Sequence, residues 1–228
     1  MLFRSLNDLA GKVIRLKDDG SVPPDNPFVG KPGARPEIFT WGHRNPQGLT
    51  IHPETGRIWE VEHGPRGGDE LNLLKPGANY GWPLATYGID YNGSIISPNK
   101  TLPGMEDPVR YWVPSISPCG LVFYSGDKFP GWKGSLFTGA LSSFALYRIE
   151  LDGEKWRSEE LLLARLQARL VPDRLAERLI PAIEQAPRDD LRIARKELLR
   201  RRLYADLGPN RSEEHTSELQ SRPHISYA

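Results

Sequence analysis

The stretch GHRNPQGLTIHPETGRIWEVEHGPRGGDELNLLKPGANYGWP, residues 42–83, decides how this chain folds and where its chemistry lies. Two loops rich in glycine and proline, GHRNPQG and EHGPRGGDE, flank a short apolar segment centred on residues 58–61, and a third loop, PGANYGWP, follows. Loops that are held by a rigid scaffold often carry the binding and catalytic groups of a protein. The density of Arg, Asn, His, Asp and Glu on these loops therefore predicts the rim of a binding site.

Short strands are expected on both sides of this stretch. Residues 9–16 (LAGKVIRL) alternate apolar and polar side chains, which is typical of a strand. Residues 49–51 and 57–61 are joined by the turn HPETG and together predict a hairpin. No helical period occurs before about residue 155. Further strands are expected in the segments PEIFTWG, DELNLL, RYWVP, GLVFYSG, GSLFTGAL and ALYRIELDG.

This pattern predicts an all-β fold for residues 1–165. Many short strands with turns about every ten residues are typical of a sandwich, a barrel or a propeller, and composition alone leaves these three open. The rhythm of GLTIHPETGRIWEV resembles that of GLVFYSGDKFPGWKGSLFTGAL, because each is a strand, a turn and a second strand that ends in a loop. This internal similarity favours the radial repeats of a propeller.

The composition changes beyond Glu159. Residues 166–210 are rich in Leu, Arg, Ala and Glu at helical spacing, and prolines divide them into two or three expected helices, which form an aberrant α-helical tail. Residues 211–228 have no apolar period and are expected to be disordered. The segments 211–221 and 225–228 also match the translation of a common sequencing adapter, so we expect residues 211–228 to be an assembly artefact.

Charge, cysteine count and missing motifs exclude several functions. The 228 residues include 30 Lys and Arg against 29 Asp and Glu, and this net charge of +1 gives no basis for binding nucleic acid. Cys119 is the sole cysteine, which excludes an internal disulfide and a cysteine metal cluster. The chain shows no apolar run long enough to span a bilayer and no signal peptide in its first ten residues. Nucleotide-binding, zinc-protease and serine-hydrolase motifs are absent.

The loop motifs resemble those of the soluble quinoprotein sugar dehydrogenases. These are the aldose sugar dehydrogenases of the glucose/sorbosone dehydrogenase family, which depend on pyrroloquinoline quinone (PQQ). The resemblance runs from about Ala10 to Leu163 through GKVIRLKDDGSVPPDNPF, GHRNPQGL, HPETGRIWEVEHGPRGGDELN, PGANYGWP, YWVPSISPCGLVFYSG and LFTGAL. It implies a six-bladed β-propeller, of which this chain resembles the C-terminal half, about three blades.

The resemblance also implies roles for individual residues. Arg44 and Asn45 are similar to the pair that contacts PQQ, and His63 and Ser115 resemble further cofactor neighbours. Gly64 and Pro65 resemble the residues whose carbonyl oxygens hold the calcium that polarises PQQ. Asp69 resembles an acidic group beside the sugar, with Arg44 the other catalytic residue, and Glu70 and Tyr80 resemble ligands of a second calcium. The implied partners are an aldose and an external electron acceptor, and the implied location is the periplasm or the exterior of the cell.

Simpler interpretations of the same residues stay open. The pair Arg44 and Asn45 also fits an ordinary turn fixed by Asn-Pro, and Asp69 and Glu70 also fit a solvated pair. The tryptophans fit packing between strands better than a sugar platform.

The sequence also departs from the family pattern. The general-base histidine of the family lies upstream of this chain, an arginine-bearing segment is expected near Ala168 but does not occur, and Ser142 or Ser143 replaces a lysine. We therefore expect an inactive fragment of a sugar dehydrogenase. The alternatives are a non-catalytic propeller module that binds carbohydrate or protein, and a gene model that encodes no working protein.

Overall fold

The computed structural model describes residues 4–163. The expected helical segment 166–210 and the expected disordered tail 211–228 lie outside the described residues. Among the described residues, no helix is long and apolar enough to cross a lipid bilayer.

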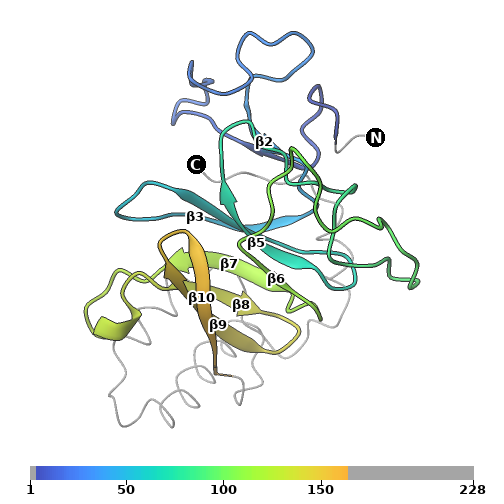
Figure 1. Cartoon of the computed structure of the whole chain (residues 1–228). Helices are drawn as coiled ribbons and strands as arrows, with labels where there is room; N and C mark the ends of the chain where they lie inside the picture. The colour runs from blue at the N-terminus through green and yellow to red at the C-terminus, as the bar shows by residue number, and fades with distance from the viewer. Residues whose placement is uncertain (1–3, 164–228) are drawn as a thin grey trace, which may run out of the picture.

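The described chain is built from antiparallel strands, which confirms the all-β prediction (Figure 1). A two-stranded sheet pairs β1 (Lys12–Ile14) with β2 (Ile38–Trp41). A four-stranded sheet has the order β3 (Pro46–Ile51), β4 (Ile58–Glu62), β5 (Asp69–Leu74) and β6 (Arg110–Trp112). A second four-stranded sheet has the order β7 (Pro118–Phe123), β8 (Leu136–Ala140), β9 (Ala145–Asp152) and β10 (Lys155–Leu162), and the 3₁₀ helix η2 (Pro130–Trp132) lies between β7 and β8.

The two four-stranded sheets repeat one pattern. In each sheet the strands follow one another in chain order, and β3 of one sheet packs against β7 of the other. The segments with similar sequence rhythm form the first two strands of each sheet, as radial repetition requires. Consecutive four-stranded antiparallel sheets of this kind are typical of propeller blades.

The hairpin β3–β4 forms where the sequence predicts it. The backbone N–H of His52 donates to the carbonyl of Arg57, and that of Gly56 donates to the carbonyl of His52. Gly56 has a φ of +67°, a conformation that side chains with a Cβ rarely adopt. The glycine therefore closes the turn.

The main core lies between the two four-stranded sheets. It is formed by one face of the first sheet, with Trp59, Val61 and Leu71, and by the facing side chains of Leu121, Leu136 and Ile149. The opposite face of β4 and β5 is polar although it is buried, because Glu60 and Glu62 alternate with the apolar residues of β4 and lie opposite Asn72 and Glu70 of β5. This polar face underlies the candidate site.

Strand β10 extends beyond the point where the composition changes. Its last residues lie within the predicted all-β segment 1–165, and Leu161 pairs with Tyr147 of β9 and Leu162 pairs with Leu146. Leu162 is buried in a cluster with Leu146 and Tyr124. Pairing and packing against β9 therefore make these residues a strand, although their leucine-rich composition alone would also suit a helix.

Candidate functional site

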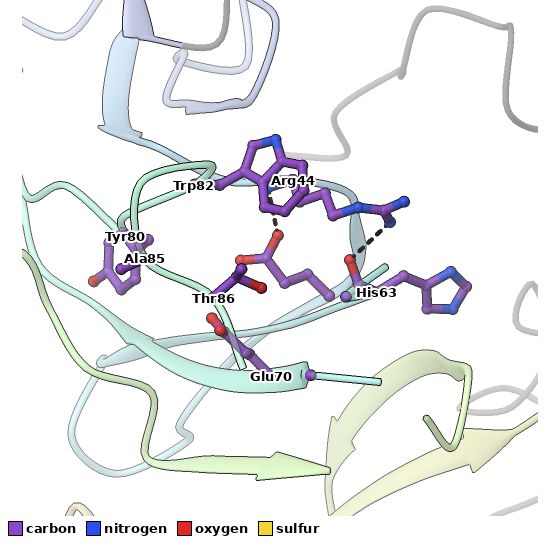
Figure 2. A pocket seen from close by; sticks show the side chains of 10 residues that line it. Arg44, His63, Glu70, Tyr80, Trp82, Ala85 and Thr86 are labelled. Carbon is purple, nitrogen blue, oxygen red and sulfur yellow. Dashed lines mark hydrogen bonds between the residues drawn. The ribbon is translucent and has the colours of Figure 1, made fainter. Parts of the chain in front are cut away.

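Arg44 lies in the turn between β2 and β3, and its guanidinium reaches the end of β4 (Figure 2). Nη1 donates to the backbone carbonyl of His63 at 3.1 Å, and Nη2 donates to the hydroxyl of Tyr91 at 3.3 Å. The guanidinium carbon lies 5.4 Å from the ring centre of Trp82 and 6.0 Å from that of Tyr91. Arg44 is thus a half-buried positive charge held in one orientation by two aromatic rings and a carbonyl.

Glu62, the last residue of β4, holds the backbone of the same turn. Its Oε2 accepts hydrogen bonds from the backbone N–H groups of Arg44 at 2.7 Å and Asn45 at 3.0 Å. Its Oε1 accepts from Nδ1 of His43 at 3.2 Å. Burial opposes the ionisation of Glu62, but the hydrogen bonds from His43 and from the two N–H groups outweigh it and lower its pKa. Glu62 is therefore a buried carboxylate whose charge is stabilised by the turn that it holds.

Two further carboxyl groups share this buried face. Nδ2 of Asn72 donates to Glu60 at 3.0 Å, to Glu62 at 3.2 Å and to Glu70 at 3.5 Å. Burial, with repulsion from Glu62 as the next cause, raises the pKa of Glu60 well above its ordinary value, and the same two causes raise the pKa of Glu70. These two groups therefore favour a bound proton or a nearby cation.

Gly64 and Pro65 follow β4 directly and form a sharp bend. Both residues are buried, yet neither of their carbonyl oxygens accepts a hydrogen bond from the described residues. A Cβ at Gly64 would overlap the backbone of Gly67 and Gly68, so only glycine allows the chain to fold back this tightly. Buried carbonyl groups are almost always paired, and unpaired ones suit a cation that takes oxygen ligands, such as calcium. The bend fits the expected calcium site.

Asp69 lies on the opposite side of β5 from Glu70 and is fully buried. One carboxylate oxygen accepts from the backbone N–H of Gly64 at 2.9 Å. The other accepts from the hydroxyl of Ser115 and from the N–H groups of Ile116 and Ser117, the latter two at 2.8 Å. The alternative interpretation of Asp69 and Glu70 as a solvated pair is wrong for Asp69, which has no exposed area. Asp69 instead joins the Gly64 bend to the loop that precedes β7.

Glu70 and Tyr80 line a small pocket beside the bend (Figure 2). The Tyr80 hydroxyl donates to the carbonyl of Leu73 at 2.7 Å and accepts from the N–H of Lys75 at 2.9 Å. Because the hydroxyl is already hydrogen-bonded to the backbone of Leu73 and Lys75, the backbone carbonyl of Tyr80 is favoured over it as a metal ligand. The other lining residues include Arg44, Glu62, His63, Gly64, Trp82 and Thr86.

His63 connects the bend to the second four-stranded sheet. Its Nε2 lies 2.8 Å from the carbonyl oxygen of Pro118, which accepts only, so Nε2 carries the proton. Burial lowers the pKa of His63 and outweighs the opposing effect of Asp69. The ring is therefore held as the neutral tautomer, which leaves Nδ1 as an acceptor.

The structure brings most of the predicted site residues together. The lining of one pocket includes Arg44, His63, Gly64, Glu70 and Tyr80, and Pro65 adjoins it in the bend. Asn45, Asp69 and Ser115 lie outside this lining. Asn45 is joined to it by its hydrogen bond to Glu62, and Asp69 by its hydrogen bond from Gly64.

The sequence-based prediction missed Glu62, Trp82 and Tyr91 as site residues. For Glu62 a signal was present, since glutamates at both 60 and 62 on a strand flanked by buried residues imply a buried polar face.

Residues 3–173 match the family model described as Glucose / Sorbosone dehydrogenase. The chain belongs to this family. It is 47% identical over 154 residues to an aldose sugar dehydrogenase of Escherichia coli, and the match covers 67% of this chain and 42% of that protein. It is 32% identical over 195 residues to quinoprotein glucose dehydrogenase B of Acinetobacter calcoaceticus, with 62% of this chain and 40% of that protein covered.

Solved structures of sugar dehydrogenases share the fold. A crystal structure of a glucose dehydrogenase matches with a TM-score of 0.69 and 53% identity, over 71% of this chain and 47% of that one. The PQQ-bound form of an aldose sugar dehydrogenase from Streptomyces coelicolor matches with a TM-score of 0.58 and 32% identity, over 75% of this chain and 44% of that one. The chain thus spans less than half the length of these relatives.

Proposed function

We propose that this chain carries the cofactor-binding part of a PQQ-dependent aldose sugar dehydrogenase. The observation that carries the proposal is the hydrogen bond from the Arg44 guanidinium to the carbonyl of His63, because it sets a fixed positive charge beside the Gly64–Pro65 bend, whose two carbonyls accept no hydrogen bond from the described residues. A quinone becomes more negative when it is reduced, and a guanidinium and a divalent cation both stabilise that charge. The quinoprotein and PQQ-bound relatives support the same cofactor.

In this proposal the residues of three loops hold the cofactor. Arg44, Asn45, His63 and Ser115 bind and orient PQQ, and the carbonyls of Gly64 and Pro65 bind calcium. When bound, PQQ supplies the acceptor for a hydride from the anomeric carbon of an aldose. Nδ1 of His63 offers a hydrogen-bond acceptor next to this group, since Nε2 is committed to Pro118.

A second calcium is proposed at Glu70 and Tyr80. The carboxylate of Glu70 and the backbone carbonyl of Tyr80 are the oxygen ligands that calcium prefers. A cation there would replace the proton that burial otherwise favours on Glu70. Calcium at this site therefore offsets the repulsion between Glu70 and Glu62 that raises the pKa of Glu70.

For Asp69 we propose a supporting role in place of direct contact with the sugar. Both of its oxygens are occupied by hydrogen bonds from the bend and from the loop before β7, and the side chain has no exposed area. A group in this environment fixes the position of the Gly64 carbonyl and of Ser115.

The parent protein is proposed to be a six-bladed propeller of which this chain supplies about three blades. An external acceptor would take electrons from the reduced cofactor, and the location proposed for the parent, from the family resemblance alone, is the periplasm or the exterior of the cell.

Binding of PQQ to the chain tests the proposal. Trp82 lies over Arg44, so its fluorescence should respond when PQQ is titrated into the protein. We expect saturable binding in calcium and at least tenfold weaker binding in a chelator. Arg44→Ala should weaken binding by about tenfold or more, since hydrogen bonds to charged groups contribute about 1.5–3 kcal/mol.

The matched control for Arg44→Ala is Arg57→Ala, which removes an arginine in the exposed turn between β3 and β4. PQQ affinity should be unchanged in this variant. Binding that does not depend on calcium, or that is equal in the wild type and Arg44→Ala, would overturn the proposal. Binding of a glycan without any PQQ binding would favour a non-catalytic module.

A further inference from the structure

The backbone of the Arg44 turn depends on a single buried carboxylate. Both N–H groups of the turn, from Arg44 and Asn45, donate to Oε2 of Glu62 at 2.7 and 3.0 Å. Glu62 is only 3% exposed. One buried oxygen thus satisfies two neighbouring backbone donors.

The carboxylate is itself locked in place. Its other oxygen accepts from Nδ1 of His43 and from Nδ2 of Asn72, each at 3.2 Å. Nε2 of His43 contacts the hydroxyl of Thr40 at 2.9 Å, and its ring stacks on Tyr80 with 4.6 Å between ring centres. The carboxylate therefore has one orientation, and that orientation sets the position of the turn.

His63, the residue that follows β4, adds two hydrogen bonds to the Arg44 turn. The N–H of His63 donates to the carbonyl of Asn45 at 3.0 Å, and the carbonyl of His63 accepts from the Arg44 guanidinium at 3.1 Å. Glu62 and His63 thus hold Arg44 by its backbone and by its side chain, and the Gly64 bend follows immediately. The turn and the residue that precedes the bend are therefore joined by hydrogen bonds.

We infer that Glu62 is a positioning residue that places the Arg44 guanidinium against the Gly64–Pro65 bend, and that cofactor affinity depends on it. This inference rests on the proposed function. Glu62 is expected to act through Arg44, because its hydrogen bonds reach the Arg44 turn and none reaches the Gly64–Pro65 bend.

A double-mutant cycle with PQQ titration in calcium tests this inference. Glu62→Gln keeps the size of the side chain but removes the charge of the carboxylate and turns an NH₂ group toward hydrogen-bond donors, so the hydrogen bonds that hold the turn weaken. We expect it to weaken PQQ binding about tenfold in the wild-type background and less than twofold in the Arg44→Ala background, because its effect is exerted through Arg44. An equal loss in both backgrounds, or no loss in the wild type, would overturn the inference.

The matched control is Glu60→Gln. Glu60 is also fully buried on the same face of β4 but makes no hydrogen bond to the Arg44 turn. It should leave PQQ affinity within about twofold of the wild type. Unfolding free energies measured for every variant confirm that the protein is fully folded during the titrations.

An NMR measurement separates failure of the inference from failure of the proposed function. In Glu62→Gln, the amide proton signals of Arg44 and Asn45 should shift upfield because the hydrogen bonds weaken, and in Glu60→Gln they should stay in place. If the wild type binds no PQQ, the proposed function fails and the role in cofactor affinity fails with it. Unchanged amide signals in Glu62→Gln would refute the positioning role itself.

Discussion

At the scale of single residues, the site is organised by carboxylates that no solvent reaches. Asp69 of β5 accepts backbone N–H groups from the loop before β7, and Glu62 of β4 accepts those of the Arg44 turn. Charged acceptors make stronger hydrogen bonds than neutral ones, especially where water is excluded. These two side chains therefore determine where the loops lie, although neither was expected to do so.

Replacing Asp69 with asparagine should destabilise the fold. The amide keeps the size of the carboxylate but turns an NH₂ group toward donors, so at least one of four hydrogen bonds becomes a clash of donors. We expect a loss of about 2–4 kcal/mol in the free energy of unfolding, measured by urea denaturation.

The control for Asp69→Asn is Asp127→Asn, because Asp127 is 90% exposed in its ion pair with Lys133. Its effect should stay within about 0.5 kcal/mol. Equal effects of the two substitutions would show that the hydrogen bonds of Asp69 contribute little to stability.

Stability should fall as the pH rises, because of Glu60. Its pKa is raised in the folded protein, first by burial and then by Glu62. Above the ordinary glutamate value of 4.5 the unfolded chain loses this proton while the folded chain keeps it, so unfolding becomes easier until the pH passes the raised pKa. The slope from one such group is at most about 1.4 kcal/mol per pH unit.

Urea denaturation between about pH 5 and 8 in a chelator measures this slope. The chelator prevents a bound cation from changing the protonation of the neighbouring Glu70. Glu60→Gln carries no titrating proton and should show a flatter dependence than the wild type. An unchanged slope in Glu60→Gln would mean that other groups cause the pH dependence.

The roles of individual residues could be predicted from the sequence only in part. The motifs around Arg44 and Gly64 identified the loops that meet in the pocket. They did not identify Glu62 as the group that holds the turn, because its partners come from β5 and from the turn itself and are brought together only by folding. Pairings of this kind leave no local pattern in the sequence.

At the scale of elements, the contact between β3 and β7 joins the two four-stranded sheets. A Cβ on Gly48 of β3 would lie 2.7 Å from the carbonyl carbon of Gly120 and 2.8 Å from the nitrogen of Leu121. Since these atoms belong to the backbone of β7, the two strands would have to move apart. The close approach explains the glycine at position 48, and a φ of +65° favours the glycine at position 120.

Gly48→Ala should therefore destabilise the pair of sheets. Overpacking of this kind costs about 1–3 kcal/mol. The matched control is Gly131→Ala in η2, where an added Cβ meets nothing within 4 Å. The melting temperatures of the two variants are compared by thermal unfolding. A Gly48→Ala variant as stable as the control would show that the strands separate at little cost.

Strands were the most predictable elements, since turn residues such as HPETG and alternating apolar residues mark them locally. The end of β10 is less clearly marked, because Leu161 and Leu162 have the composition of a helix and form a strand by pairing with β9. Local propensity is a weak guide wherever pairing partners decide the conformation.

At the scale of the whole molecule, the site depends on loops from successive sheets. The loop before β3, the bend after β4 and the loop before β7 meet around Glu62, His63 and Asp69. The sequence resemblance identified this family and the all-β fold, which the family match and the strand pairing confirm. The number of about three blades, implied by the resemblance, and the helical tail, expected from composition, stay predictions.

Oxidation of sugar by this chain alone should be negligible. Each described histidine is already engaged: His43 with Glu62 and Thr40, His52 with the N–H groups of its own turn, and His63 with Pro118. A base on the sugar hydroxyl is needed for hydride transfer, and the one acceptor nitrogen left among these histidines, Nδ1 of His63, is proposed to face the cofactor and not the sugar. Dye reduction with glucose, PQQ and calcium measures this, and a robust rate would contradict the prediction.

The most direct test of the central claim is a crystal structure of the chain with PQQ and calcium, with the metal located by its anomalous scattering. We predict a calcium ion about 2.3–2.6 Å from the carbonyl oxygens of Gly64 and Pro65, and PQQ between that ion and the Arg44 guanidinium. PQQ bound away from Arg44, or a calcium ion with no contact to the Gly64–Pro65 bend, would contradict the account.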